Sequence, residues 1–173
     1  MELLILVDEN DQEIGSMEKM EVHEKGLLHR AFSILIFNSK NEMLLQQRAL
    51  SKYHSGGLWT NTCCSHPRKE ESTLQAANRR LIEEMGFSTE LEEKFSFIYR
   101  AELDKNMIEH ELDHVFFGTF EGEFQFNREE VNAIRWISIS DLIQEIKDSP
   151  SSFTEWFKIL MNEYLDKLTL KSN

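Results

Sequence analysis

Hydrophobic positions along the chain recur with two different periods, which predicts a protein built from both strands and helices. Short apolar or alternating runs predict strands at 3–8, 31–37, 95–103, 112–120 and 131–139, and a further extended piece near Ile14. Residues 42–47 follow a turn at 38–41 and predict the second strand of a hairpin. Strands and helices alternate along the whole chain, which favours an α/β fold with helices layered on a sheet.

Three segments have the spacing of helices. Apolar residues recur every three or four positions over 72–85, and Gly86 follows where a helix commonly ends. Residues 140–147 predict a short helix with Ser140 as its N-cap. Apolar positions at 153–168 predict one continuous amphipathic helix that packs on the rest of the protein.

Length and charge narrow the class of protein. The 173 residues predict a single domain, 1–173, and the formal net charge of −12 argues against binding to nucleic acid or to an anionic membrane. No segment has the roughly 20 apolar residues of a membrane span, and the acidic N-terminus does not resemble a signal peptide. An anionic substrate would therefore need a local cluster of Lys and Arg.

The two cysteines are neighbours, Cys63 and Cys64, in the extended segment 58–66. A disulfide between adjacent residues would be strained and would close almost no loop. We therefore expect reduced thiols and a cytoplasmic protein. Strand alternation places Cys63 on the opposite face from Cys64 and predicts that it is a small buried core residue.

Charged residues are concentrated in the helix predicted at 72–85. Arg79, Arg80, Glu83 and Glu84 lie three to four positions apart, so their side chains are neighbours on the helix surface. Carboxylates arranged in this way suit a hard cation that bridges to phosphate oxygens. The same spacing also occurs in an ordinary solvated helix with i,i+4 ion pairs, and the acids alone do not separate the two interpretations.

The segment 65–87 resembles the Nudix box, G-x5-E-x7-R-E-U-x-E-E-x-G-U, in which U is apolar. Matching positions are occupied by Glu71, Arg79, Leu81, Glu83, Glu84, Gly86 and Phe87. Ser65 replaces the leading glycine, and Arg80 replaces the glutamate that follows the arginine. Nudix hydrolases use these glutamates to hold Mg²⁺, so the substitution by Arg80 favours gripping a diphosphate over cleaving it.

Motifs outside the box resemble the type I isopentenyl-diphosphate isomerases. They comprise LHRAFS at 28–33, RALSK at 48–52, WTNTCCSHP at 59–67, YRA at 99–101 and IEHE at 108–111. The resemblance implies a Nudix fold, a mixed sheet sandwiched between helices, with an N-terminal extension of about 1–30 over the active site and a C-terminal helix at about 150–173. It also implies reversible isomerisation of isopentenyl diphosphate to dimethylallyl diphosphate, in isoprenoid precursor biosynthesis.

The resemblance also implies residue roles. Cys64 and Glu111 would be the proton-transfer pair, and Tyr99 would hydrogen-bond Glu111. The diphosphate would be bound by Lys19, Arg48, Lys52 and Arg80, with Trp156 facing a cationic intermediate and Trp59 as a possible floor of the pocket. Glu84 would hold a Mg²⁺ ion that bridges to the diphosphate, and no flavin is expected.

Histidines and carboxylates at alternating positions indicate a second metal site. Cys64 and His66, like Glu109 and Glu111, lie two positions apart and therefore share a strand face. Three imidazoles and two carboxylates, those of His23, His29, His66, Glu109 and Glu111, offer a donor set that suits Zn²⁺, Mn²⁺ or Fe²⁺, of which we expect Zn²⁺ or Mn²⁺. His110 and His114 should face away, and His54 has no assigned role. Each histidine taken alone is more commonly an ordinary hydrogen-bonded residue.

Two alternatives remain open. One is a Nudix hydrolase of a nucleoside diphosphate derivative, and the other is a protein that binds a diphosphate without turnover. The expected partner in each case is a small-molecule diphosphate, and no oligomer is required for the site. Because His23 precedes the first core strand, ligation would order the N-terminal segment, which we expect to be mobile without metal.

Overall fold

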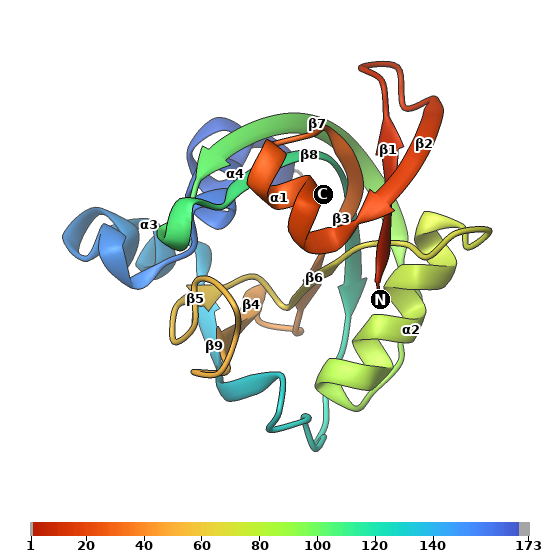
Figure 1. Cartoon of the computed structure of the whole chain (residues 1–173). Helices are drawn as coiled ribbons and strands as arrows, with labels where there is room; N and C mark the ends of the chain where they lie inside the picture. The colour runs from red at the N-terminus through yellow and green to blue at the C-terminus, as the bar shows by residue number, and fades with distance from the viewer. Residues whose placement is uncertain (1, 170–173) are drawn as a thin grey trace.

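The computed structural model describes residues 2–169 of the chain. Within them, nine strands form one curled mixed sheet in which β2, β1, β3, β4 and β5 are successive neighbours (Figure 1). The strands are β1 (Leu3–Val7), β2 (Glu13–Glu18), β3 (His29–Phe37), β4 (Glu42–Arg48), β5 (Trp59–Thr60), β6 (Cys63–Ser65), β7 (Glu92–Glu102), β8 (Ile108–Thr119) and β9 (Val131–Ser138).

Strand β3 organises the sheet, because it pairs with β1, β4, β6 and β8. Its pairing with β8 is parallel and runs from His29 opposite Glu111 to Phe37 opposite Thr119. Strand β7 then pairs antiparallel with the outer edge of β8, and β9 pairs antiparallel with β4. The long parallel pairing places the start of β3 beside the start of β8. The predicted metal ligands of these two strands lie there.

Helices cover the sheet on both sides (Figure 1). On one side α2 (Thr73–Met85) packs on Ile34 and Ile36 of β3, and on the other α3 (Ile139–Asp148) and α4 (Glu155–Glu163) pack on Leu35 and Phe37. Successive residues of β3 thus enter two different cores, which explains its near-continuous apolar sequence. The predicted α/β architecture with the sheet between helices is confirmed.

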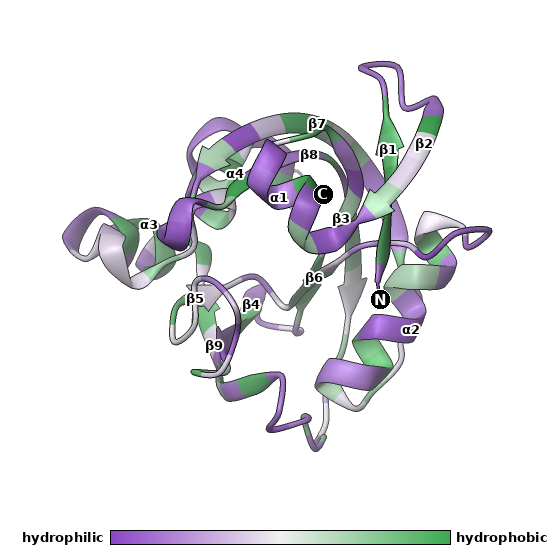
Figure 2. Cartoon of the chain, in the orientation of Figure 1, coloured by the Kyte–Doolittle hydropathy of each residue, from purple (hydrophilic) through white to green (hydrophobic). Residues whose placement is uncertain are grey.

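Helix α2 has its ends where the sequence predicts them. Ser72 accepts a hydrogen bond from the backbone N–H of Gln75, whose side chain accepts one from the N–H of Ser72 in return. Gly86 ends the helix with φ of 76°, a left-handed conformation that glycine adopts without strain. Figure 2 shows hydrophilic and hydrophobic residues alternating along this helix, as expected for a helix with one side packed on the sheet.

The predicted hairpin of β3 and β4 is closed only next to its turn, where Phe37 pairs with Met43. Beyond that pair the two strands separate, and the segment 59–65 lies between them, with β5 paired to β4 and β6 paired to β3. Thr62 accepts from the N–H of Ile36 and donates to the carbonyl of Leu44, and Asn61 donates to the carbonyl of Ile34. These side-chain bonds divide the extended segment predicted at 58–66 into β5 and β6, and they fix the residues that lead into Cys64.

Two further predictions about helices need correction. Helix α3 begins one residue earlier than predicted, because Ser138 and not Ser140 accepts from the N–H of Asp141 as the N-cap. The continuous helix predicted at 153–168 is interrupted at Tyr164, which separates α4 from α5 (Leu165–Thr169). The last four residues of the predicted C-terminal segment, 170–173, lie outside the described residues. Short 3₁₀ turns at Asp104–Asn106 and Pro150–Ser152 complete the structure.

The N-terminal segment joins the edge of the sheet and then crosses toward its centre. The β1–β2 hairpin pairs with β3 through Leu6 and His29, and α1 (Lys19–Lys25) follows directly. The carboxylate of Glu18 caps the first N–H groups of α1, and Gly26 ends it in the left-handed conformation. This seven-residue helix carries Lys19 and His23 to the site.

Candidate active site

A buried group of three histidines and two glutamates lies where β3, β6 and β8 meet under α1. One nitrogen or oxygen atom from each side chain falls within 4.8 Å of every other in the group, which consists of His23, His29, His66, Glu109 and Glu111. His23 comes from α1, His29 begins β3, His66 directly follows β6, and the glutamates are on one face of β8. These are the five residues that the sequence predicts as ligands of one ion.

Backbone hydrogen bonds orient two of these imidazoles toward the carboxylates. Nδ1 of His23 donates to the carbonyl of Lys19 at 2.6 Å, and Nδ1 of His29 donates to that of Leu27 at 2.9 Å. Their Nε2 atoms lie 3.3 and 3.8 Å from Oε2 of Glu109, and all three atoms are buried without a hydrogen-bond partner. Buried acceptor atoms that converge without partners fit a divalent cation, and the backbone bonds are the outer-shell contacts of a ligating histidine.

Burial and ion pairing shift pKa values in this group in different directions, and the carboxylate of Glu109 raises the pKa of His23 although burial alone would lower it. Burial lowers the pKa of His66, which keeps its imidazole neutral. Burial alone would raise the pKa of Glu109, but the neighbouring imidazoles of His23 and His54 hold it well below the ordinary value for a glutamate. Neutral imidazoles and charged carboxylates are the forms that bind a metal ion.

His54, which sequence reasoning left without a role, also contacts this group. Its Nε2 lies 3.2 Å from Oε1 of Glu109, and its side chain is buried. It comes from the loop between β4 and β5, and a single histidine in such a loop gave no sequence signal of burial. In contrast, His110 and His114 face away as predicted, toward the carbonyl of Gly26 and toward Asp11 and Glu93.

Cys64 lines a small cavity beside the group and keeps its proton. Burial raises the pKa of its thiol to about 12, so the thiol is neutral near pH 7. The thiol donates to Oδ1 of Asn61 at 3.0 Å and lies 3.6 Å from the hydroxyl of Ser33. Ser33 in turn donates to the buried carboxyl of Asp113 at 2.7 Å. The adjacent Cys63 is fully buried in the core beneath α2, as its position in the strand predicts.

Glu111 faces the same cavity from β8. Tyr99 donates to its Oε2 at 2.7 Å, the hydrogen bond that was expected, and Nε2 of His66 lies 3.0 Å from its Oε1. Burial raises the pKa of Tyr99 well above the ordinary value, so its hydroxyl stays a donor. The cavity of about 60 Å³ therefore has a protonated thiol and a hydrogen-bonded carboxylate among its lining residues.

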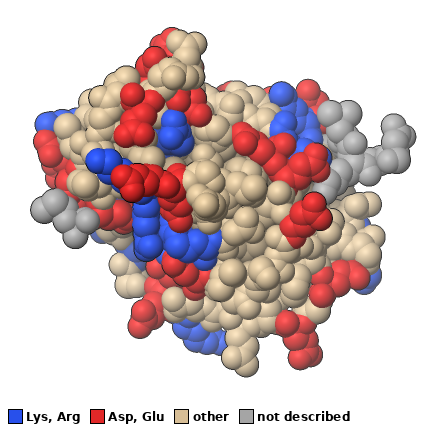
Figure 3. Space-filling model, turned by 90° about the vertical axis from the view of Figure 1, so that its right-hand side faces the viewer, with Lys and Arg blue, Asp and Glu red and all other residues tan. Residues whose placement is uncertain are grey.

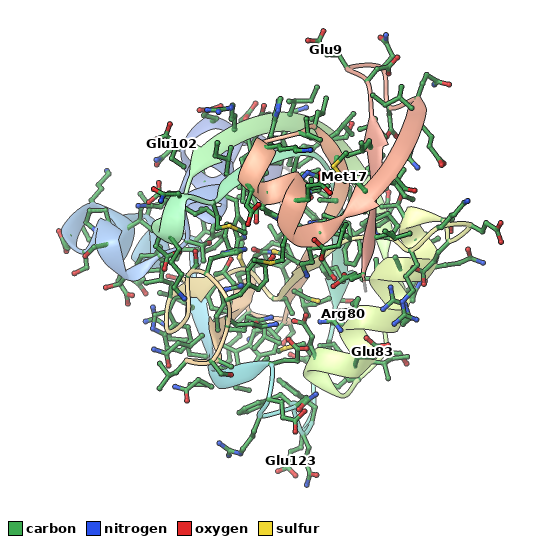
Figure 4. All side chains as sticks on the ribbon, viewed as in Figure 1. Glu9, Met17, Arg80, Glu83, Glu102 and Glu123 are labelled. Atoms are coloured by element: carbon green, nitrogen blue, oxygen red, sulfur yellow. The ribbon has the colours of Figure 1, made fainter. Side chains whose placement is uncertain are left out.

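Lysine and arginine side chains surround the mouth of the cavity. Lys19, Arg48, Lys52 and Arg80 all line it, and it shares Lys19, Lys52 and Arg80 with an adjoining hollow of about 600 Å³. Figure 3 views the side that carries α2, where blue basic side chains gather next to red acidic ones. Figure 4 shows Arg80 leaving α2 on the side that faces the sheet. The local cluster of bases that an anionic substrate needs is present.

Each of three basic side chains at the mouth is paired with an acid. Arg80 donates to Glu83 and Glu84, Lys52 to Glu130, and Lys19 to Glu2. Although burial alone would lower the pKa of Arg80, the carboxylate of Glu84 and its other acidic neighbours raise it, so its charge is fixed. Glu84 is buried, also accepts from Gln46 at 2.9 Å, and lies outside the His/Glu group.

Two tryptophans were expected near the pocket, and one is there. Trp156 of α4 lines the cavity, with the guanidinium of Arg48 5.2 Å from the centre of its ring. Trp59 is not among the lining residues, because its ring packs in the core beneath α3 and α4 with Arg135 4.5 Å above it. The expectation that Trp59 forms the floor of the pocket is therefore wrong.

Comparison with known proteins gives consistent matches. Residues 27–157 match the NUDIX domain. An isopentenyl-diphosphate Delta-isomerase of Serratia proteamaculans is 55% identical over 162 residues, covering 94% of this chain and 90% of the relative. One of Pectobacterium atrosepticum is 53% identical over 156 residues, covering 90% and 87%.

Solved structures share the fold at low sequence identity. A Deinococcus radiodurans protein superposes with a TM-score of 0.77 at 16% identity, covering 94% of this chain and 99% of that one. The MutT protein of Methanosarcina mazei gives a TM-score of 0.67 at 16% identity, covering 82% and 96%. Among the described residues, no helix has the length and apolar character to cross a membrane.

Proposed function

Because the chain belongs to the isopentenyl-diphosphate Delta-isomerases of the NUDIX family, we propose that it interconverts isopentenyl diphosphate and dimethylallyl diphosphate with Cys64 and Glu111 as its proton-transfer pair. The observation that carries this assignment is that both groups line one small cavity whose mouth is surrounded by basic side chains. A small-molecule diphosphate is the substrate class that this arrangement suits.

The reaction requires two acid–base groups. A proton adds to C4 of isopentenyl diphosphate, positive charge develops at C3, and a proton leaves C2 to give the dimethylallyl isomer. The neutral thiol of Cys64 can give a proton, and the carboxylate of Glu111 can accept one. The two groups exchange these tasks when the direction reverses, and Tyr99 holds the Glu111 carboxylate in place.

Binding is assigned to the residues around the mouth. Arg48 and Arg80 would grip phosphate oxygens through paired N–H groups, and Lys19 and Lys52 would add positive charge. The ring face of Trp156 would stabilise the developing cation by roughly 0.5–2 kcal/mol. The guanidinium of Arg48 lies 5.2 Å from the centre of the Trp156 ring. The group assigned to the diphosphate and the group assigned to the cation are therefore close enough to contact the two ends of one short substrate.

Two metal ions complete the proposal. His23, His29, His66, Glu109 and Glu111 would hold one Zn²⁺ or Mn²⁺ ion, whose charge would tune the acidity of Glu111. Glu84 would hold a Mg²⁺ ion that bridges to the diphosphate. All of these residues come from one chain, so the site needs no second subunit. The free thiols of Cys63 and Cys64 suit a cytoplasmic enzyme of isoprenoid precursor biosynthesis.

The test is proton NMR of isopentenyl diphosphate incubated with the protein and Mn²⁺ and Mg²⁺ in heavy water. We expect the dimethylallyl isomer to appear with deuterium in its methyl groups. An unchanged alkene together with release of phosphate from a panel of nucleoside diphosphate derivatives would overturn the proposal in favour of a hydrolase. Binding of isopentenyl diphosphate with neither reaction would identify a protein that binds without turnover.

A further inference from the structure

The backbone of the loop between β4 and β5 is tightly constrained. Ser55 has φ of 53°, which is costly for a residue with a Cβ atom. A Cβ atom at Gly56 would lie 2.8 Å from the carbonyl oxygen of Leu50, so only glycine fits there. The strained turn directs the side chain of the preceding residue, His54, inward, where it is 3% exposed.

Three hydrogen bonds, from β4 and from the turn before β8, hold this loop in place. Arg48 donates to the carbonyl of His54 at 3.2 Å, and the N–H of Ser55 donates to Asp104 at 3.3 Å. Lys105 donates to the carbonyl of Tyr53 at 3.1 Å. Asp104 and Lys105 belong to the turn that leads into β8, so the loop is fastened to the strand that carries Glu109.

The hydrogen bonds of His54 determine which nitrogen faces Glu109. Nδ1 lies 3.1 Å from the hydroxyl of Ser55, which can donate to it. Nε2 then carries the proton and donates to Oε1 of Glu109 at 3.2 Å. The other oxygen of the same carboxylate, Oε2, faces His23 at 3.3 Å and His29 at 3.8 Å.

We propose that His54 is a positioning residue of the metal site, one that holds Oε1 of Glu109 so that Oε2 faces the ligand histidines. This inference rests on the proposed function, since it requires that the His/Glu group binds a metal ion. His54 lies outside the group of donor atoms that fall within 4.8 Å of one another. Its Nε2 contacts Oε1 of Glu109, whereas His23 and His29 face Oε2. Without His54, Oε1 would lose a buried partner, and the carboxylate would be free to rotate.

Two substitutions of His54 separate this role from simple packing. In His54→Gln the amide nitrogen can reach the place of Nε2 and donate to Glu109. In His54→Asn the shorter amide reaches only the place of Nδ1, so it can contact Ser55 but not Glu109. The two variants are similar in polarity and differ in the one contact that matters. His114→Ala, which removes a histidine that faces away from the site, is the control.

The measurement is Mn²⁺ affinity by isothermal titration calorimetry on metal-free protein, together with the visible absorption spectrum of the Co²⁺ form. We expect His54→Asn to bind Mn²⁺ about 10- to 100-fold more weakly with an altered Co²⁺ spectrum, the effect of losing an outer-shell partner. The Mn²⁺ affinities of His54→Gln and His114→Ala should stay within about threefold of that of the parent protein, because neither substitution removes the contact with Glu109.

The outcomes separate this inference from the proposal on which it depends. Equal affinities in the Asn, Gln and parent proteins would overturn the positioning role and leave the metal site intact. Equal weakening in both variants would also overturn it, because the reach of the amide would then not matter. Failure of the parent protein to bind Mn²⁺ or Co²⁺ would overturn the metal site itself, and the role of His54 with it.

Discussion

Cys63 and Cys64 allow a matched pair of substitutions, because two neighbouring thiols lie in different surroundings. Cys64→Ala removes the thiol that lines the cavity, and Cys63→Ala removes one that is fully buried among the core residues beneath α2. We expect the first substitution to reduce turnover and leave stability nearly unchanged. The second should reduce stability and leave turnover within a few fold.

The magnitudes follow from what each sulfur contacts. Loss of the buried Cys63 sulfur resembles deletion of a core methyl group and should cost about 1 kcal/mol, or about 2–4 °C in Tm for a chain of this size. Cys64 donates one hydrogen bond to Asn61, whose Oδ1 still accepts from Thr60 at 2.9 Å, so no buried acceptor is left unpaired. Loss of a general acid should lower kcat by about 10²- to 10⁴-fold.

The assays are the conversion of isopentenyl diphosphate followed by proton NMR and thermal unfolding followed by circular dichroism. Mn²⁺ affinity serves as the control and should be equal in the two variants and the parent, because neither thiol belongs to the His/Glu group. Turnover by Cys64→Ala within threefold of the parent would refute the acid–base role of this thiol. A larger loss of turnover in Cys63→Ala than in Cys64→Ala would refute the assignment of the two faces.

Three further changes test the site and its support. Removing metal with a chelator should lower Tm by about 5–10 °C relative to protein in Mn²⁺ at 100 times Kd, measured by calorimetry, and an unchanged Tm would contradict a bound ion. Arg80→Ala should raise KM for isopentenyl diphosphate by about tenfold or more with a smaller loss of kcat, and the reverse pattern would place Arg80 in the chemical step. Hydrogen bonds from Arg79 lower the pKa of Glu71, so their stabilisation is complete above the ordinary glutamate pKa and is lost as pH falls through the lower folded value. Thermal unfolding should therefore show that Glu71→Gln lowers Tm at pH 7 and much less at pH 3, whereas a penalty independent of pH would exclude a charge effect.

The sequence predicts most of the fold because its strands and helices have strong periodicity. The end of α2 could be predicted from Gly86, and the apolar segment 31–37 predicted a strand covered on both faces. The hairpin of β3 and β4 was predicted too simply, because β5, β6 and the side chains of Asn61 and Thr62 lie between these strands beyond the first pair. Contacts of that kind depend on tertiary structure and leave no periodic signal.

The site could be predicted as a set of residues but not as a geometry. Alternation along β8 predicts that Glu109 and Glu111 face together, whereas only the fold brings His23 from the N-terminal segment to meet them. No helix was predicted at 19–25, since its seven residues carry too little periodicity to identify. His54 was missed because burial of a polar loop residue is decided by the contacts of the loop and not by its composition.

The parallel pairing of β3 and β8 also has a consequence for how the protein folds. These strands are far apart in the chain, and nine residue pairs must align before His29 lies opposite Glu111. Such non-local pairing forms slowly, and a slip by one residue would turn Glu109 and Glu111 to the wrong face. Metal capture should accordingly be among the last events in refolding, so the rate at which Co²⁺ colour appears would report when the long-range alignment is complete.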